Sequence, residues 1–150
     1  MTVRFNHIGH CVVDLERSVR FYRDLFGFTV ERELRPPDDP SARLLGLESP
    51  LDMTAVYLVR DGFVLELLHY AAPGRTRPPR VRTMDEPGLT HLSVSVDDIA
   101  AVCARVVEYG GDVVADSNVG SAVFVRDPDG QLIELLPMAY RHHLDSQGFS

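Results

Sequence analysis

The spacing of apolar residues along the chain predicts a strand followed by a helix, and this pair occurs twice. Residues 3–13 and 90–96 have the pattern expected of strands, with large apolar residues between polar ones. Each strand leads into a stretch with apolar residues at helical spacing. These residues are Leu15, Val19, Tyr22, Leu25 and Phe26 in the first stretch, and Ile99, Val102, Cys103, Val106 and Val107 in the second.

The ends of both helices carry their own signals. Asp14 and Asp98 are placed to accept hydrogen bonds from the first backbone N–H groups of each helix. Gly27 follows the first helix and Gly110 the second, which is the expected stop signal. Three strands are then predicted in each half, with the last two joined by a tight turn at residues 61–62 and 127–130.

The two halves are copies of one βαβββ unit. His7 aligns with His91 in the strand-and-helix part, at an offset of 84 residues. Near the end of each copy, FVLELL aligns with QLIELL, which places Glu66 on Glu134 at an offset of 68 residues. The difference between the offsets predicts an insertion in the first copy, most naturally in its Pro-rich part at about residues 34–51.

The predicted organisation is therefore α+β, with two tandem βαβββ modules. Residues 1–72 form the first module, with the insertion at about 34–51, and residues 88–139 form the second. Residues 73–87, rich in proline and arginine, connect them, and residues 140–150 form a polar tail.

Composition and charge narrow the classes of partner. The 150 residues are 45% hydrophobic, and a formal net charge of −7 argues against nucleic acid or an anionic membrane as the main partner. The first residues, MTVRFNHIGH, lack the apolar run of a signal peptide, so we expect a cytoplasmic protein. Cys11 and Cys103 both fall in predicted core elements, and we expect two reduced core thiols.

Candidate chemistry lies at four positions on the predicted strands. Glu66 interrupts the apolar run FVLELLHY, and a buried carboxylate is costly unless it is paired or bound to a cation. His91 shares its strand face with Ser93 and Ser95, a composition typical of a cleft wall. If the modules pack as pseudo-twofold partners, His7, Glu66, His91 and Glu134 converge. Two imidazoles and two carboxylates would suit one divalent ion: Zn, Ni, Co, Mn or Fe(II).

Four motifs give the chain a family resemblance. FNHIGHCVVDLERSVRFYRDLFGF, DGFVLELL, GLTHLSVSVDDI and RDPDGQLIELL resemble the vicinal oxygen chelate superfamily. That superfamily includes glyoxalase I, methylmalonyl-CoA epimerase, fosfomycin-resistance proteins, extradiol dioxygenases and bleomycin-binding (bleomycin resistance) proteins. The resemblance implies that the two modules form a curved mixed sheet around a metal cleft, and that the protein is a homodimer.

The resemblance also implies roles for single residues. His7, Glu66, His91 and Glu134 match metal-ligand positions, and a His/Glu/His/Glu set resembles bacterial glyoxalase I. The implied activity is that of an isomerase or lyase acting on a small substrate that chelates the metal through vicinal oxygens. The metal would stabilise an enediolate or enolate, and Glu134 would carry the proton, with Glu66 or Glu48 as alternatives.

Two residues differ from the glyoxalase I pattern, and two other functions are alternatives to the lyase or isomerase hypothesis. Cys11 and Tyr70 stand where glutathione-dependent glyoxalase I has an arginine and an asparagine that contact glutathione, which argues against a glutathione substrate. One alternative is an Fe(II) extradiol-type dioxygenase with His7, His91 and Glu134 as ligands. The other is a protein that binds an antibiotic without chemistry, although such proteins commonly lack the four ligands.

Other polar residues have simpler interpretations. His10 and His69 lie on the strand faces opposite the candidate ligands and are predicted to be structural. Tyr57, Phe124 and Met53 either line the cleft or pack ordinarily. The connector arginines either contact substrate or, as we favour, belong to a solvated linker; they are Arg75, Arg77, Arg80 and Arg82.

Overall fold

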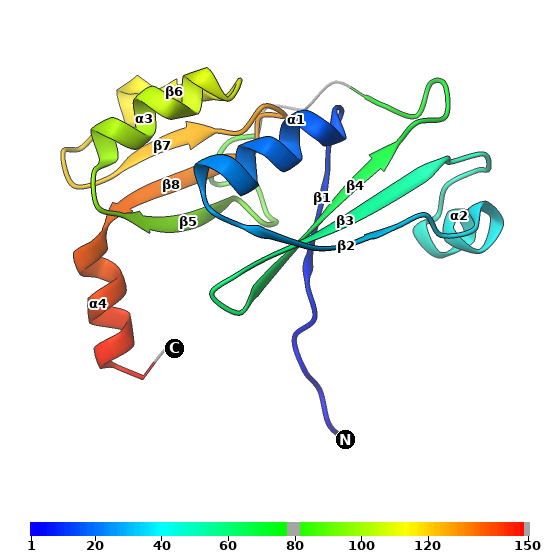
Figure 1. Ribbon diagram of the computed structural model, residues 1–150, viewed down its shortest axis with the longest axis horizontal. Coiled ribbons are helices and arrows are strands. Elements are labelled where there is room, and N and C mark those ends of the chain that lie inside the picture. Colours follow the sequence, from blue (N-terminus) through cyan, green and yellow to red (C-terminus); the bar gives the residue numbers. More distant parts are fainter. Residues whose placement is uncertain (78–81, 149–150) are drawn as a thin grey trace. The chain divides into compact units, whose positions relative to one another are not determined.

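The computed structural model describes residues 1–77 and 82–148, and the chain divides into two compact units (Figure 1). The first unit is Met1–Pro78 and the second is Pro79–Ser150. The boundary falls inside the predicted connector at 73–87; residues 78–81 of that segment, Arg80 among them, lie outside the described residues. Among the helices of the described residues, none is long and apolar enough to cross a membrane.

The first unit is a four-stranded mixed sheet with one helix across it. The elements follow the order β1 (Ile8–Cys11), α1 (Leu15–Arg20), a π-helical turn (Phe21–Leu25), β2 (Thr29–Leu34), α2 (Asp38–Leu45), β3 (Met53–Arg60) and β4 (Phe63–Tyr70). The strand order is β1-β4-β3-β2, with β1 parallel to β4 and the other pairs antiparallel.

The second unit repeats this topology. Its elements are β5 (His91–Val96), α3 (Ile99–Glu108), β6 (Asp112–Val114), a 3₁₀ turn (Ala115–Ser117), β7 (Val123–Arg126), β8 (Leu132–Pro137) and α4 (Met138–Ser146). The strand order is β5-β8-β7-β6, again with the first strand parallel to its neighbour. The α+β class with two βαβββ modules is confirmed.

The strand register agrees with both sequence offsets. Gly9 pairs with Glu66 in the first sheet, and Ser93 pairs with Glu134 in the second. Gly9 and Ser93 differ by the offset of the first alignment, and Glu66 and Glu134 by the offset of the second. The two halves therefore correspond residue by residue at the strands that carry the candidate ligands.

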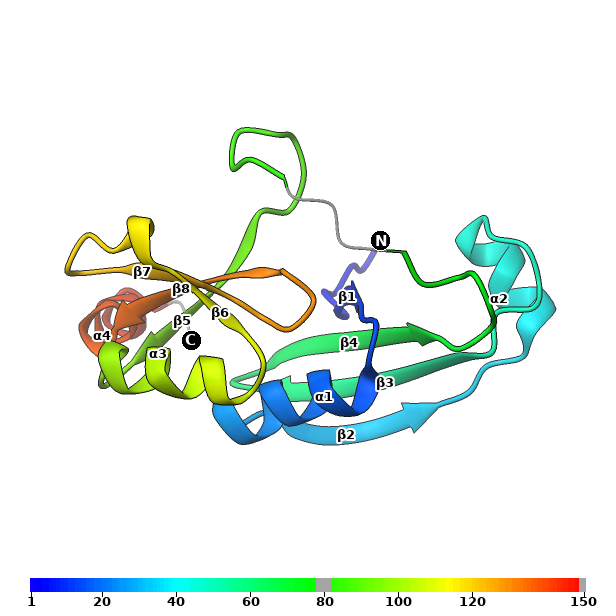
Figure 2. The same cartoon turned by 90° about the horizontal axis from the view of Figure 1, so that it is seen from above.

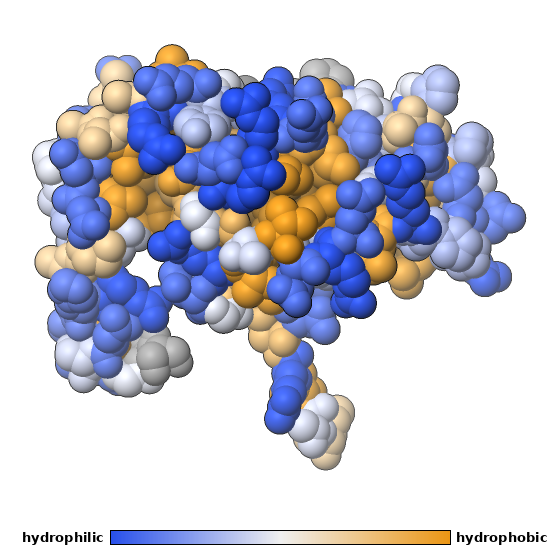
Figure 3. All heavy atoms as spheres, in the orientation of Figure 1, coloured by the Kyte–Doolittle hydropathy of each residue, from blue (hydrophilic) through white to orange (hydrophobic). Residues whose placement is uncertain are grey.

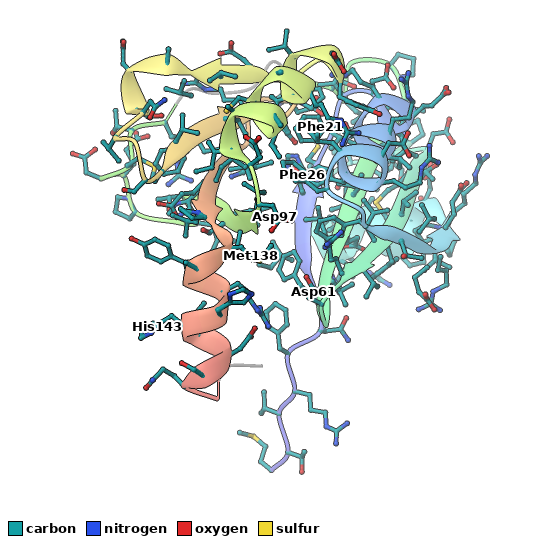
Figure 4. All side chains as sticks on the ribbon, turned by 60° about the vertical axis from the view of Figure 1, so that its left-hand side comes forward. Phe21, Phe26, Asp61, Asp97, Met138 and His143 are labelled. Carbon is teal, nitrogen blue, oxygen red and sulfur yellow. The ribbon has the colours of Figure 1, made fainter. Side chains whose placement is uncertain are left out.

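One face of each sheet is covered by its helix, and the core lies between them (Figure 2). In the first unit Leu65 and Leu67 of β4 are fully buried, as are Phe21 and Tyr22 at the end of α1. Phe21, labelled in Figure 4, also meets Phe26 edge to face with ring centroids 5.4 Å apart. In the second unit the equivalent layer is formed by Val106, Val123, Val125, Ile133 and Leu135.

The predicted caps and turns are present. The carboxylates of Asp14 and Asp98 accept hydrogen bonds from the N–H groups of Arg17 (3.0 Å) and Ala101 (2.9 Å). Asp61 has φ +49° and the glycine after it +76°, which suits the two-residue turn between β3 and β4. In the second turn, the buried Asp127 carboxylate accepts the N–H groups of residues 129 and 131.

The N-terminal strand is shorter than predicted. Strand character over residues 3–13 was expected, but β1 spans Ile8–Cys11. β4 offers parallel partners only to these four residues, Leu65 through Leu68. Residues 1–6 are exposed, Phe5 at 72%, because no strand among the described residues pairs with them.

Two segments expected to be irregular contain helices. α2 lies inside the predicted insertion, where Asp38 closes the segment by accepting the N–H groups of Leu51 (3.1 Å) and Asp52 (3.0 Å). The polar tail predicted from residue 140 instead belongs to α4, which packs on β5 and β8. An Arg141–Asp145 ion pair of 2.7 Å supports it, and its visible surface is largely hydrophilic (Figure 3).

The prediction that Cys11 is a core residue is wrong. Both cysteines are free thiols, but Cys11 is exposed, and only Cys103 is partly buried. Cys11 lies on the edge strand β1, paired with Leu68 on the sheet face away from the helix. Burial raises the pKa of the Cys103 thiol.

Replacing Gly27 by alanine is expected to lower the free energy of unfolding by about 2–3 kcal/mol. Gly27 has φ +69°, and an added Cβ would collide with the Arg60 guanidinium, whose Nη1 donates to the Phe26 carbonyl (2.6 Å). Gly46 is the matched control, because it has φ +67° but nothing within 4 Å of an added Cβ. Gly46→Ala should cost only about 1 kcal/mol in urea unfolding, and equal losses would contradict the role given to Arg60.

Candidate metal site

The candidate ligands lie on the sheet faces that the core helices do not cover. Paired residues on neighbouring strands share a face, so Gly9 and Cys11 share one with Glu66 and Leu68. On β4, Leu65 and Leu67 point into the core, whereas the Glu66 side chain retains 13% exposure. Because side chains alternate along β4, burying Leu65 and Leu67 in the core places Glu66 on the open face.

Each module brings one histidine to one glutamate. In the first, His7 Nε2 lies 3.1 Å from Glu66 Oε2, and in the second His91 Nε2 lies 3.7 Å from Glu134 Oε2. Two ligand atoms bound at 2.0–2.2 Å to one ion are about 2.8–3.6 Å apart for octahedral or tetrahedral angles. The first pair therefore already has the spacing of two ligands of one metal, and the second is slightly wider.

The residue before each histidine fixes the orientation of the ring. His7 Nδ1 lies 2.6 Å from Asn6 Oδ1, and His91 Nδ1 lies 2.9 Å from Thr90 Oγ1. An amide oxygen only accepts hydrogen bonds, so this hydrogen bond forms when His7 carries its proton on Nδ1, and Nε2 is then the ring atom turned toward Glu66. In the neutral imidazole, a nitrogen lone pair then faces a carboxylate oxygen. Such a pair needs a second proton or a cation between its members, so the donor set fits a divalent metal.

An aromatic ring stands beside each histidine. Tyr57 pairs with Glu66 and Phe124 pairs with Glu134 across the central strands of the two sheets. The His7 and Tyr57 rings meet edge to face at 5.4 Å and 86°, and the His91 ring meets Phe124 at 5.2 Å and 83°. Tyr57 and Phe124, which were expected either to line the cleft or to pack ordinarily, therefore contact the candidate ligands His7 and His91.

A hydroxyl group contacts each carboxylate. Ser93 Oγ donates to Glu134 Oε2 at 2.9 Å. The hydrogen bond between Tyr57 and Glu66 raises the pKa of Tyr57, with burial and the negative charge of Glu66 acting in the same direction. Arg32 lies 5.6 Å from the Tyr57 ring centroid and opposes the shift.

The insertion shapes the far end of the Glu66 face. Ala42 of α2 forms a small apolar cluster with Leu51 and Met53, and two residues of β4, Leu68 and Tyr70, pack against it. Met53 therefore packs in this apolar cluster, and its contacts there are with apolar residues of the first unit. Burial raises the pKa of Tyr70, with smaller contributions from Cys11 and Glu66.

Other predicted residues occupy simpler environments. Glu48 is exposed after α2, where its backbone carbonyl accepts a hydrogen bond from Arg75. His10 packs edge to face on Tyr22, and His69 Nδ1 lies 3.3 Å from the Val12 carbonyl.

The histidines of α4 and the arginines of the connector also lie in simple environments. His142 and His143 are exposed on α4, where Figure 4 labels His143. Arg82 bonds to the carbonyl oxygens of Glu86, Pro87 and Leu89 within its own loop. Arg75 and Arg82 thus stabilise local loops, as the linker interpretation holds.

The structure brings His7 to Glu66 and His91 to Glu134, and the meeting of the two pairs at one ion stays a prediction. Sequence reasoning missed Asn6 and Thr90. A signal for them was present, because they occupy aligned positions immediately before the two histidines.

A duplicated βαβββ module with a His–Glu pair on each open sheet face defines a vicinal oxygen chelate protein. The chain belongs to the Glyoxalase/Bleomycin resistance protein/Dioxygenase superfamily, whose sequence profile matches residues 4–135. Membership of this superfamily implies a divalent metal ion.

Two bacterial proteins are similar to this chain in sequence, and one solved structure is similar to it in fold. A lactoylglutathione lyase of Neisseria meningitidis is 34% identical over 140 residues, 89% of this chain and 90% of its own. A lactoylglutathione lyase of Haemophilus influenzae is 32% identical over 134 residues, 83% of this chain and 85% of its own. A glyoxalase family protein of Bacillus cereus has the same fold, with a TM-score of 0.73 at 18% identity over 91% of this chain and 95% of its own.

Proposed function

We propose that this protein is a divalent-metal-dependent lyase or isomerase that removes a proton beside a carbonyl of a small oxygen-chelating substrate and returns it to the substrate, through an enediolate or enolate. The observation that carries the proposal is the repeated pair, His7 with Glu66 at 3.1 Å and His91 with Glu134 at 3.7 Å. The lyase names of the two bacterial relatives favour this chemistry over that of an extradiol dioxygenase.

The four side chains of these pairs would hold the metal. A divalent ion bound there would act as a Lewis acid and polarise a substrate carbonyl. Asn6 and Thr90 keep the two imidazole rings turned so that Nε2 is the atom offered. The homodimer expected from the resemblance stays a prediction.

Glu134 is our choice for the proton carrier. Its side chain is 25% exposed against 13% for Glu66, and it lies farther from its histidine, at 3.7 Å against 3.1 Å. A carboxylate held less tightly is freer to leave the imidazole and reach a substrate carbon. With a hemithioacetal, Glu134 would take the proton from the carbon beside the carbonyl, whose electron pair moves toward the carbonyl oxygen, and return it to the former carbonyl carbon, while the hydroxyl proton passes to that oxygen. With a 2-substituted acyl thioester, Glu134 would return the proton to the carbon from which it came. The sum is an isomerisation without an oxidant.

The substrate class follows from the open face. We propose a hemithioacetal of a 2-oxoaldehyde, or a 2-substituted acyl thioester, because both place two oxygens or an enolisable carbonyl beside a removable proton. Cys11 is exposed, and Tyr70 packs against Met53, so neither supplies the positive charge or amide expected for gripping glutathione. We therefore expect hemithioacetals of simpler thiols to be better substrates than that of glutathione.

Proton exchange in deuterated water tests the proposal. Protein loaded with Ni²⁺, Co²⁺, Mn²⁺ or Zn²⁺ should incorporate deuterium into a hemithioacetal or acyl-thioester substrate, as followed by NMR. Chelation should stop the exchange, and restoring the ion should recover it. Absence of exchange with both substrate classes would reject the proposal. Oxygen uptake with an aromatic diol would then favour the dioxygenase, and metal-free antibiotic binding unaffected by Glu134→Ala would favour a binding protein.

A further inference from the structure

Each candidate metal-binding carboxylate is held by one hydroxyl, but the two hydroxyls come from opposite sides. Glu134 receives its hydrogen bond from Ser93 on β5, the parallel neighbour of β8, at 2.9 Å. Glu66 receives its hydrogen bond from Tyr57 on β3, the antiparallel neighbour of β4. The hydroxyl donor to the glutamate therefore comes from the parallel neighbouring strand in the second module and from the antiparallel neighbouring strand in the first.

The matching positions in the other module lack the hydroxyl. Gly9 occupies in the first module the place that Ser93 occupies in the second, and Phe124 occupies the place of Tyr57. The ring contact to histidine is nearly the same with and without the hydroxyl, 5.4 Å for Tyr57 and 5.2 Å for Phe124. Packing alone therefore does not require a tyrosine at residue 57.

We propose that Tyr57 and Ser93 are positioning residues that orient Glu66 and Glu134 for metal binding, an inference that rests on the proposed metal site. An ionised carboxylate turns about its last side-chain bond, and a hydroxyl that donates to it fixes that rotation. The orientation is then set before the ion arrives, so less conformational entropy is lost on binding. Because each module supplies one hydroxyl to its glutamate, we infer that both carboxylates need this orientation.

Removing either hydroxyl should weaken metal binding without unfolding the protein. Tyr57→Phe and Ser93→Ala are each expected to reduce affinity for Mn²⁺ or Ni²⁺ by roughly 10–100-fold, measured by titration calorimetry on metal-free protein. Ser95→Ala is the matched control, because Ser95 is on the same strand but pairs with Leu136 rather than a glutamate. Its metal affinity should equal that of the unaltered protein.

Moving the hydroxyl to the other strand should restore binding. A Cβ at Gly9 would lie 3.6 Å from Glu66 Oε2 and 3.6 Å from Leu68 Cδ1, both ordinary contacts. Gly9→Ser combined with Tyr57→Phe would give Glu66 the donor that Glu134 already has. Phe124→Tyr combined with Ser93→Ala is the reciprocal exchange. Both double variants should regain most of the lost affinity.

The outcomes separate this inference from the proposed function. If the unaltered protein binds no ion, the metal site fails, and the positioning role fails with it. If the unaltered protein binds metal and Tyr57→Phe and Ser93→Ala bind it equally tightly, only the positioning role is overturned. Loss of affinity that neither exchange restores, with unchanged urea unfolding of the metal-free variants, would also overturn it.

Discussion

Glu134→Gln is expected to reduce kcat by roughly 10²–10⁴-fold, the range that a general base contributes. Glutamine keeps an oxygen that can accept the Ser93 hydrogen bond, seen at 2.9 Å for Glu134. It also keeps a neutral oxygen ligand, so bound metal should persist while the proton carrier is lost. The measurement is kcat together with the metal content of the same sample.

Two other glutamates provide the comparison. Glu66→Gln should retain most of kcat, because Glu66 lies 3.1 Å from His7 and acts only as a ligand in this assignment. Glu48→Gln should retain full activity, since Glu48 is exposed after α2. A collapse of kcat in Glu66→Gln with activity retained in Glu134→Gln would reverse the roles, and loss only in Glu48→Gln would assign the base to the insertion.

His7→Ala and His91→Ala are each expected to remove nearly all bound metal. If one ion is shared, it loses a nitrogen ligand in either variant, and the two carboxylates that remain with a single imidazole hold it poorly. Activity should then fall to the level of the chelated protein. Elemental analysis of protein purified without added metal gives the occupancy of each variant.

A histidine outside the site provides the control. His142→Ala, on an exposed position of α4, should leave both metal content and activity unchanged. A clear alternative is that each module binds its own ion through its own pair. In that case each single variant would retain half of the metal, and this outcome would contradict a shared site.

Much of the fold follows from local sequence signals. Asp14, Asp98, Gly27 and the two tight turns act within a few residues, and the structure uses each of them as predicted. The strand register agrees with the repeat offsets, because homologous strands pair in the same way in both modules. The same alignment picked out Glu66 and Glu134 before any geometry was known.

Other features depended on contacts with distant residues. Cys11 has the apolar character of a core residue, yet the pairing of β1 with β4 turns it to the open face. α4 has a polar sequence and is recognisable only from its packing on β5 and β8. α2 lies in the segment interpreted as a Pro-rich insertion and has no side-chain N-cap; Asp38 closes that segment by accepting the N–H groups of Leu51 and Asp52.

The sequence by itself determined the duplicated module, its helix ends and turns, and the one histidine and one glutamate that each copy contributes. These properties depend on periodicity and on short-range steric and hydrogen-bonding preferences, which a single chain displays directly. Only the tertiary structure decided that each histidine faces its glutamate through Nε2, and that Tyr57 and Ser93 supply the hydroxyls from opposite strands. Ser93 lies 41 positions from Glu134 along the chain, whereas Tyr57 lies fewer than ten positions from Glu66. In both cases strand pairing, rather than distance along the chain, sets which side chains meet.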